Sequence, residues 1–347
     1  MTLAVRYTSA RTLDTAPATA SEPGPGEVEL APAYVGICGT DLHIFHGDMD
    51  ARVAPPAVLG HEMAGRIVRV GSGVEGWRPG DAVTVMPLRW DDTCPACRAG
   101  HQHICQHLDF IGIDSPGAMQ QRWTVPASTL IRLPATLPLD QAALVEPTAV
   151  AVHDVGRAAV KDGEKVVVVG GGPVGVLIAL VARAAGADVR VVELNAHRRL
   201  LAEELGLTTW DPAATDITEL VQRWTGEAGA DVAFEVSGAA GGVDTAVDVL
   251  GVRGRLCLVA IHPRPREINL HRFFWRELTL VGARLYDRGD FERAVALVAD
   301  GTVPAQRLIT KIVPLTEAPA AFEALESGGD VMKILVDCTD DAQGAAV

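Results

Sequence analysis

The sequence has few basic residues and no long uninterrupted apolar run. It contains 30 lysines and arginines against 44 aspartates and glutamates, so its formal net charge is -14. This acidic balance disfavours nucleic acid and anionic membrane surfaces as partners, because both bind to basic faces. No run of about 18 apolar residues is free of charge or repeated glycine, and the sequence therefore predicts no transmembrane helix.

Cysteine is scarce as well, with six in 347 residues. The first residues, 1–6, have the character of a strand rather than of a secretion signal. We therefore expect a cytoplasmic protein in which the cysteines are thiols or metal ligands instead of disulfides. The chain is longer than one domain usually is, which predicts two domains.

The first part of the chain is rich in glycine, proline and short apolar runs. Strand candidates bounded by turn residues lie at 28–34, 63–70 and 81–85. This pattern predicts an irregular, mostly β domain over residues 1–152.

From residue 153 to 289 the pattern changes to alternating strands and helices. Strand candidates lie at 166–169, 189–193, 232–235 and 256–260, and helical stretches include 175–185 and 197–205. This alternation predicts a parallel sheet with crossover helices. From residue 290 to 347 we expect one helix, 291–300, and short strands that rejoin the first domain, so that the middle domain is an insertion.

A glycine-rich turn follows the first strand of this middle region. Gly170-x-Gly172-x-x-Gly175 lies between an apolar strand and an apolar helix, the context in which such a turn binds the pyrophosphate of a dinucleotide. Glu193 ends the next strand, where a carboxylate accepts hydrogen bonds from a ribose diol and repels a 2′-phosphate. We therefore predict NAD rather than NADP, although Arg198 nearby could hold that phosphate. The alternative is a glycine-rich turn without a ligand.

Two groups of residues have the chemistry of metal ligands. Cys38 and the adjacent pair His61 and Glu62 offer a thiolate, an imidazole and a carboxylate, and Gly60 permits the irregular backbone that would let both neighbours reach one ion. The alternative is a buried cysteine and a solvated His-Glu pair.

The second group is Asp91-x-x-Cys94-x-x-Cys97-x7-Cys105, within a lobe at about residues 88–108. Three cysteines and a carboxylate can form a closed tetrahedral zinc site. His101 and His103 are competing ligands. Cys257 and Cys338 lie in apolar strand candidates, and we expect them to pack in the core.

Together these motifs resemble the zinc-dependent medium-chain dehydrogenase/reductase family, the alcohol dehydrogenase superfamily. Within it, the resemblance is to the branch of sorbitol, 2,3-butanediol and threonine dehydrogenases. Its markers are Gly-Ile-Cys-Gly-Thr-Asp-Leu-His at 36–43, Gly-His-Glu at 60–62, Cys-Pro-Ala-Cys at 94–97, Val-Glu-Pro at 145–147, the Gly170 turn and Leu-Ile-Thr at 308–310. The resemblance implies a GroES-like, mostly-β catalytic domain (1–152 and 290–347) and a Rossmann domain with a doubly wound parallel sheet (153–289). It also implies NAD and Zn²⁺ as cofactors and a homotetramer or homodimer.

The resemblance assigns roles residue by residue. Cys38, His61 and Glu62 match the catalytic zinc ligands, and Glu146 matches a carboxylate that can replace or supplement Glu62. Asp41 matches the partner of the zinc histidine. Thr40 and His43 match the proton relay. The cofactor contacts are expected from Gly170, Gly172, Pro173, Val174, Gly175, Glu193, Arg198, Val259, Ala260, Ile261, Leu285 and Tyr286.

The chain departs from the family pattern at several positions. Asp91 stands where the structural zinc lobe normally has its first cysteine, which gives a ligand set of Asp91, Cys94, Cys97 and Cys105. Leu285 stands where sorbitol dehydrogenases have an arginine, and it favours a smaller substrate such as a short diol. The usual Ala-Glu-Tyr after the lobe is replaced by the residues at 120–122.

The resemblance implies the reversible, NAD-dependent oxidation of a secondary alcohol to a ketone, in a polyol, vicinal diol or sugar. One alternative is an amino-alcohol dehydrogenase of the L-threonine 3-dehydrogenase type, and another is a zinc-free quinone or enoyl reductase. A protein that binds NAD and zinc without catalysis is an alternative of a different class. Thr40 and His43 argue against it, because a silent protein needs no proton path.

Overall fold

The computed structural model describes residues 2–19, 21–262, 264–326 and 329–339. Its internal contacts separate two compact units. The first comprises Met1–Glu146, Ala294–Ala299 and Ala305–Val347, and the second comprises Pro147–Arg293 and Asp300–Pro304. The chain first passes between the units within helix α4 (Val145–Arg157) and returns within helix α10 (Arg288–Ala299). The predicted limits at 152/153 and 289/290 fall in the same two helices and stay predictions.

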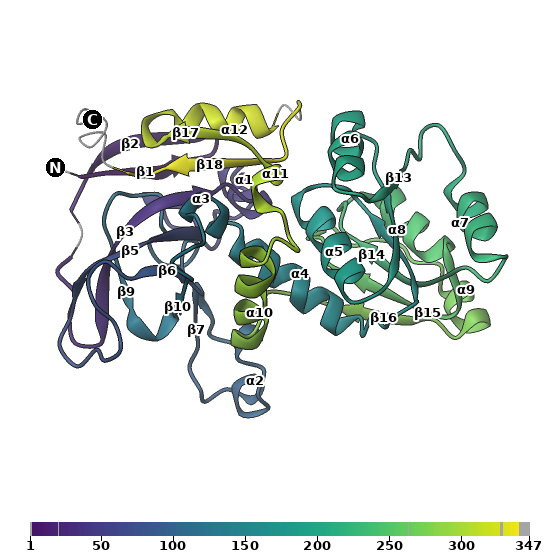
Figure 1. Cartoon of the computed structure of the whole chain (residues 1–347), viewed down its shortest axis with the longest axis horizontal. Coiled ribbons are helices and arrows are strands. Elements are labelled where there is room, and N and C mark those ends of the chain that lie inside the picture. The colour runs from purple at the N-terminus through teal and green to yellow at the C-terminus, as the bar shows by residue number, and fades with distance from the viewer. Residues whose placement is uncertain (1, 20, 263, 327–328, 340–347) are drawn as a thin grey trace. The chain divides into compact units, whose positions relative to one another are not determined.

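The first unit is mostly β, as the sequence predicts (Figure 1). Its strands are β1 (Thr2–Ser9), β2 (Thr12–Ala18), β3 (Glu27–Gly36), β4 (Ala57–Val58), β5 (Glu62–Val70), β6 (Ala82–Val85), β7 (Leu88–Arg89), β8 (Asp109–Phe110), β9 (Trp123–Pro126), β10 (Leu130–Arg132), β17 (Ile309–Pro314) and β18 (Lys333–Asp337). Its helices are α1 (Gly39–Phe45), α2 (Pro95–Arg98), α3 (Leu139–Ala142), α11 (Ala305–Leu308) and α12 (Ala318–Glu326), with 3₁₀ turns at Gln102–Ile104, Ala127–Thr129 and Leu315–Glu317.

The main sheet of this unit joins the two ends of the chain. Its strand order is β10-β6-β5-β3-β18-β17, and β9 pairs with the other end of β3. The C-terminal strand β18 runs antiparallel to β3, with Leu335 opposite Gly36 and Asp337 opposite Tyr34. This register brings the first residue of β18, Lys333, to the end of β3 that leads into Cys38.

The second unit contains a six-stranded parallel sheet in the order β13-β12-β11-β14-β15-β16. The strands are β11 (Lys165–Val169), β12 (Asp188–Val192), β13 (Thr208–Trp210), β14 (Ala230–Glu235), β15 (Leu250–Leu258) and β16 (Thr279–Gly282), and the helices are α5 (Pro173–Ala184), α6 (Ala196–Glu204), α7 (Ile217–Thr225), α8 (Ala240–Asp248) and α9 (Leu270–Arg276). The strand order reverses between β11 and β14. In doubly wound sheets, ligands bind beyond the carboxyl ends of the strands at that point.

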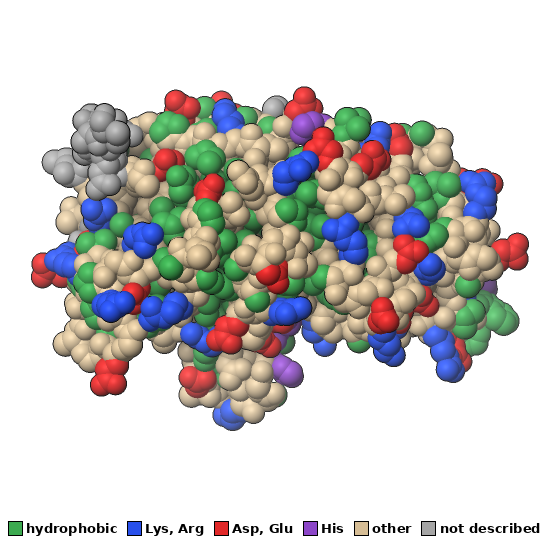
Figure 2. All heavy atoms as spheres, viewed as in Figure 1, with side chains coloured by type: hydrophobic (Ala, Val, Ile, Leu, Met, Phe, Trp, Pro, Cys, Tyr) green, Lys and Arg blue, Asp and Glu red, His purple; other side chains and the backbone are tan. Residues whose placement is uncertain are grey.

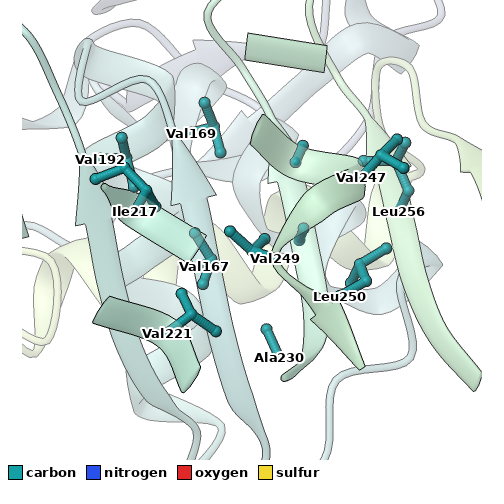
Figure 3. Packing of buried hydrophobic residues seen from close by; sticks show 12 residues of the cluster. Val167, Val169, Val192, Ile217, Val221, Ala230, Val247, Val249, Leu250 and Leu256 are labelled. Carbon is teal, nitrogen blue, oxygen red and sulfur yellow. The ribbon is translucent and has the colours of Figure 1, made fainter. Parts of the chain in front are cut away.

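The core of this sheet is made from short branched side chains. Figure 3 shows Val167 and Val169 of β11 near Val192 of β12 and near Ile217 and Val221 of α7. Both faces of a parallel sheet are covered by helices, which is why its strands read as continuous valine runs. Each buried valine stabilises the unit by about 1.5–3 kcal/mol relative to an exposed one.

The predicted strands and helices are present, with three corrections. The strand expected at 256–260 is longer and ends at Leu258, because the amides of Val259 and Ala260 both bond to the carbonyl of Glu235. Helix α5 begins at Pro173, since proline fits the first helical turn, where no amide partner is needed. The expectation of one helix from 290 on was wrong, because α11 and α12 follow α10. The alanine-rich α12 buries Ala318, Ala321 and Phe322, which have helical spacing.

Among the helices of the described ranges, none combines the length and the apolar character needed to cross a membrane.

Candidate functional site

Strand pairing in the first unit brings the first predicted metal ligands together. Gly36, at the end of β3, pairs with Glu62, at the start of β5, so Cys38 lies beside the His61–Glu62 pair. One ligand atom from each of Cys38, His61 and Glu62 lies within 4.8 Å of the other two. Gly60 has a φ of +98°, and a Cβ atom there would lie 2.8 Å from side-chain atoms of Met119 and Val35. Glycine at 60 is therefore needed for both conformation and space.

Asp41 supports the sulfur and nitrogen ligands. Its Oδ2 accepts a hydrogen bond from the amide of Cys38 at 2.9 Å, and its Oδ1 lies 3.7 Å from Nδ1 of His61. Oδ1 of Asp41 and Nδ1 of His61 are buried and have no hydrogen-bond partner among the described residues. Burial raises the pKa of Asp41, whereas the neighbouring His61 opposes that rise.

These observations fit a divalent cation. The thiol, imidazole and carboxylate are the ligand types that zinc prefers, and the orphaned imidazole nitrogen faces the carboxylate that commonly orients a metal-bound histidine. Burial opposes charge on His61, but the negative charge of Asp41 and then the Cys38 side chain outweigh it and raise the pKa of His61 well above its ordinary value. The cluster thus concentrates negative groups around one buried position.

Lys333 is a member of this cluster that sequence reasoning missed. Its Nζ lies 2.6 and 2.8 Å from the two carboxylate oxygens of Glu62 and 3.2 Å from the carbonyl of Ile37. Burial lowers the pKa of Lys333, but the charge of Glu62 and then of Cys38 outweighs burial and raises it. Glu62 is therefore shared between an ammonium group and the proposed metal. The one signal in the sequence is a lysine directly before the apolar run Ile334–Val336.

Glu146 lies in the first turn of α4 and is 3% exposed. Its charge contributes to the raised pKa values of both His61 and Lys333, so it lies near the cluster. The group of mutually close ligand atoms found among the described residues consists of Cys38, His61 and Glu62 without Glu146. A ligand role for Glu146 stays a prediction.

The two residues of the predicted proton relay lie on α1, three positions apart. Thr40 and His43 therefore share one side of that helix. Nδ1 of His43 lies 3.2 Å from Oδ2 of Asp48, and the side chain of His43 is 34% exposed. His43 can thus exchange protons with solvent while Asp48 fixes its ring.

The lobe assembles the second predicted ligand set. Asp91, Cys94, Cys97 and Cys105 each place one ligand atom within 4.8 Å of the others, and the three cysteines are buried. The sulfur of Cys94 accepts hydrogen bonds from two backbone amides, that of Cys97 at 3.4 Å and that of Gln106 at 3.5 Å. The Gln106 amide and then that of Cys97 lower the pKa of Cys94 to about 7, whereas burial raises that of Cys97 to about 12. His101 and His103 lie outside this group of ligand atoms.

We expect protein purified without chelators to contain two zinc ions per chain. Cys97→Ser should lose the lobe zinc, and a loss of about 2 kcal/mol would lower Tm by ~4–8 °C, with little change in kcat. Metal analysis by mass spectrometry, together with thermal unfolding, measures both effects. One zinc per chain in the wild type, retained in Cys97→Ser, would show that the lobe is empty.

The glycine-rich turn in the second unit has the geometry of a phosphate cradle. Gly170 has a φ of +107°, and a Cβ atom on Gly175 would lie 1.8 Å from the carbonyl oxygen of Gly170. Pro173 and Val174 form the first turn of α5, whose N-terminus follows Gly172. A cavity of about 320 Å³ lies beside this turn. Its lining includes Gly170 just after β11, Glu193 just after β12 and Thr245 of α8. These features fit a dinucleotide, because a glycine-rich turn lets the backbone approach its phosphates and a helix N-terminus attracts them.

Glu193 and Arg198 lie at the same turn. Oε2 of Glu193 accepts a hydrogen bond from the backbone amide of Gly171, and Oε1 accepts one from that of Asn195, each at 2.7 Å. The Nε of Arg198 is buried without a partner among the described residues. Its Nη1 lies 3.7 Å from the point that a Cβ atom added to Gly172 would occupy. Arg198 thus lies beside the proposed phosphate cradle, and Glu193 fixes the turn.

The remaining predicted cofactor residues follow β15 and β16. The amides of Val259 and Ala260 bond to the carbonyl of Glu235, and Ile261 is 61% exposed. Leu285 has a φ of +60°. The ring of Tyr286 is buried edge-on against that of Phe291, with centroids 5.0 Å apart. The structure brings these residues to the same unit as the glycine turn, and their contact with a cofactor stays a prediction.

Glu193→Ala should narrow the preference for NAD over NADP. The change removes a charge that repels a 2′-phosphate and an acceptor for the ribose diol, an effect of about 1–3 kcal/mol. The ratio of kcat/KM for the two cofactors measures it, with Glu203→Ala as the control on the neighbouring helix. A wild-type protein that uses both cofactors equally would contradict the assignment.

Comparison with known proteins gives matches along nearly the whole chain. The model of the alcohol dehydrogenase GroES-like domain matches residues 24–135, and that of the zinc-binding dehydrogenases matches residues 173–300. The chain is 47% identical to 2-dehydro-3-deoxy-L-galactonate 5-dehydrogenase of Pseudoalteromonas atlantica, over 96% of this chain and 98% of the relative. It is 33% identical to a sorbitol dehydrogenase of Halalkalibacterium halodurans, over 92% of this chain and 94% of that relative.

Solved structures agree with these matches. The crystal structure of 2R,3R-butanediol dehydrogenase from Bacillus subtilis has a TM-score of 0.90 at 31% identity and covers 97% of this chain and 99% of its own. A zinc-binding dehydrogenase from Sinorhizobium meliloti, described as putative and bound to NADP, has a TM-score of 0.91 at 33% identity with the same coverage.

Proposed function

Since the chain belongs to the zinc-dependent medium-chain alcohol dehydrogenase family, we propose that it oxidises a secondary alcohol of a polyhydroxylated substrate to a ketone, reversibly, with NAD. The observation that carries this proposal is the convergence of Cys38, His61 and Glu62 within 4.8 Å of one another. A phosphate-binding turn in the same chain supplies the second requirement of hydride transfer.

The mechanism assigns a task to each residue of the cluster. When bound, zinc would supply a Lewis acid that lowers the pKa of the substrate hydroxyl, and NAD would supply the hydride acceptor. Cys38, His61 and Glu62 would hold the metal, and Asp41 contacts the first two. Lys333 neutralises part of the negative charge that these ligands bring together.

Thr40 and His43 move the proton. The hydroxyl of Thr40 accepts the proton that leaves the substrate and passes it on toward His43. His43 releases it to solvent, to which its side chain is 34% exposed. The carboxylate of Asp48, 3.2 Å from Nδ1 of His43, orients the ring during this transfer.

The substrate we propose first is a sugar acid or another chain with several hydroxyl groups. The 47% identical relative is named for a deoxy sugar acid, and further relatives are named for sorbitol, butanediol and xylulose. That relative favours a hydroxylated acid over the short diol that Leu285 suggested. A site that hydrogen-bonds a second hydroxyl discriminates against an analogue without it, because its buried polar groups then stay unpaired.

A substrate panel tests this proposal. We expect NADH formation with sugar acids, polyols or vicinal diols at a kcat/KM well above that for 2-butanol, which has one hydroxyl. L-threonine belongs in the panel, because preference for it would favour the amino-alcohol alternative. A kcat/KM for 2-butanol equal to that of the best polyhydroxylated substrate would contradict the substrate class. Binding of NADH and zinc without turnover of any compound would favour a silent protein.

We also propose that the protein is a homo-oligomer. β16 is an edge strand of the parallel sheet, and the adjacent α9 exposes Leu270, Phe274 and Trp275 to 74, 77 and 68%. Figure 2 shows apolar side chains where Figure 1 labels α9. An apolar helix beside a sheet edge is suited to a second copy. None of the six cysteines, all of which lie in the described ranges, forms a disulfide, which supports a reducing compartment, the cytoplasm.

A further inference from the structure

We propose that Asp91 and His107 together replace the missing cysteine of the lobe: Asp91 binds the zinc and His107 holds its carboxylate in the binding orientation. This inference rests on the proposed lobe zinc and names a residue that the ligand set does not contain. His107 is therefore a positioning residue for the metal.

The geometry of Asp91 shows why it needs support. Its Oδ1 accepts the amides of Thr93 at 2.8 Å and Cys94 at 2.9 Å. Its Oδ2 lies 2.5 Å from Nδ1 of His107. Amides hold one oxygen and an imidazole holds the other, so rotation of the carboxylate would break hydrogen bonds at both oxygens. One carboxylate oxygen of Asp91 lies within 4.8 Å of the ligand atoms of Cys94, Cys97 and Cys105.

His107 is tied to the cluster at two points. Its backbone amide donates to the sulfur of Cys105 at 3.3 Å, and its side chain reaches back to Asp91. One residue therefore links the last cysteine of the lobe to the carboxylate that opens it. His101 and His103 are less well placed, because their rings pack edge-on against each other with centroids 6.3 Å apart.

An aspartate ligand needs a hydrogen-bonding partner to orient it more than a cysteine ligand does. A thiolate has one ligating atom, whereas a carboxylate has two oxygens and can rotate away from the metal. Partners that hydrogen-bond a metal ligand fix its orientation, and their loss commonly lowers metal affinity about 10–100-fold. We therefore expect His107→Ala to release the lobe zinc about 10–100-fold faster, while Asp91→Ala loses it.

The experiment isolates the lobe by using full-length Cys38→Ser protein, which is expected to lack the other zinc. Zinc release to a colorimetric chelator is followed in two backgrounds, with Asp91 unchanged and with Asp91→Cys, and each is compared with and without His107→Ala. Asp91→Ala is measured beside them. His101→Ala is the control, as another exposed histidine of the lobe. His107→Asn tests rescue, because its amide nitrogen can take the place of Nδ1. Circular dichroism verifies that each variant is folded.

The expected result is fast release in His107→Ala, recovery in His107→Asn and normal release in His101→Ala. With Asp91→Cys, which restores a four-thiolate site, His107→Ala should have no further effect. Unchanged release in His107→Ala, or an equal acceleration in the Asp91→Cys protein, would overturn the positioning role. Loss of zinc in His107→Ala but not in Asp91→Ala would also overturn it, by making His107 the ligand. If the Cys38→Ser parent holds no zinc, the lobe site itself fails, which is a distinguishable outcome.

Discussion

Cys38→Ser is expected to abolish turnover and leave the binding of NADH intact. The thiolate is one of three ligands in the cluster of Cys38, His61 and Glu62, and serine is a poor ligand for zinc at neutral pH. A Lewis-acid metal supplies several kcal/mol of transition-state stabilisation, so kcat/KM should fall by about 10³-fold or more. The glycine turn that we assign to NADH lies in the other compact unit. Steady-state kinetics and NADH fluorescence titration measure the two properties separately.

A matched control removes a different thiol from the same unit. Cys338 is buried and lies outside both groups of ligand atoms found among the described residues. Cys338→Ala should lower stability somewhat but keep both zinc ions and most of the activity. Full activity of Cys38→Ser after treatment with a chelator would exclude a catalytic metal at this cluster.

Lys333→Met is expected to destabilise the first unit strongly. Nζ lies 2.6 Å from a carboxylate oxygen of Glu62, and the two side chains are 3% and 1% exposed. Removal of one partner leaves the other charge buried and unpaired, which costs about 3–5 kcal/mol. Urea unfolding of chelator-treated protein measures this loss without compensation by a metal.

The double variant Lys333→Met/Glu62→Gln tests whether the unpaired carboxylate of Glu62 causes the loss of stability. It removes both charges, so it should recover much of the lost stability, although Glu62→Gln also removes a metal ligand and with it activity. If the single and double variants are equally unstable, the cost comes from packing of the lysine chain and not from the unpaired carboxylate. Added zinc should stabilise Lys333→Met, because the metal can then balance the charge of Glu62.

The sequence predicted the members of the cluster that lie in short local motifs. Cys38, His61 and Glu62 stand out because a thiol, an imidazole and a carboxylate are ligand types of zinc and lie in two short motifs that match one family. Lys333 could not be predicted in the same way, because it reaches Glu62 through the pairing of the C-terminal strand β18 with β3. Such a long-range contact depends on sheet order, which the sequence pattern does not specify.

The lobe and the last helices show the same limit. Spacing identified Asp91 and the three cysteines, and it also made His101 and His103 candidates. It could not identify His107, whose role depends on a turn that brings it back to Asp91. Helix α12 was missed because a short alanine-rich stretch has weak apolar periodicity and becomes a helix by packing Phe322 in the core.

The central claim is that the chain transfers hydride from a secondary alcohol to NAD at a zinc held by Cys38, His61 and Glu62. The most direct measurement uses the best substrate of the panel with deuterium on the carbinol carbon, and detects the label in NADH by mass spectrometry. The zinc-loaded protein should form labelled NADH and ketone in equal amounts, zinc-stripped protein should form neither, and added zinc should restore both. Undiminished transfer by the stripped protein, or ketone formation with unlabelled NADH, would contradict the claim.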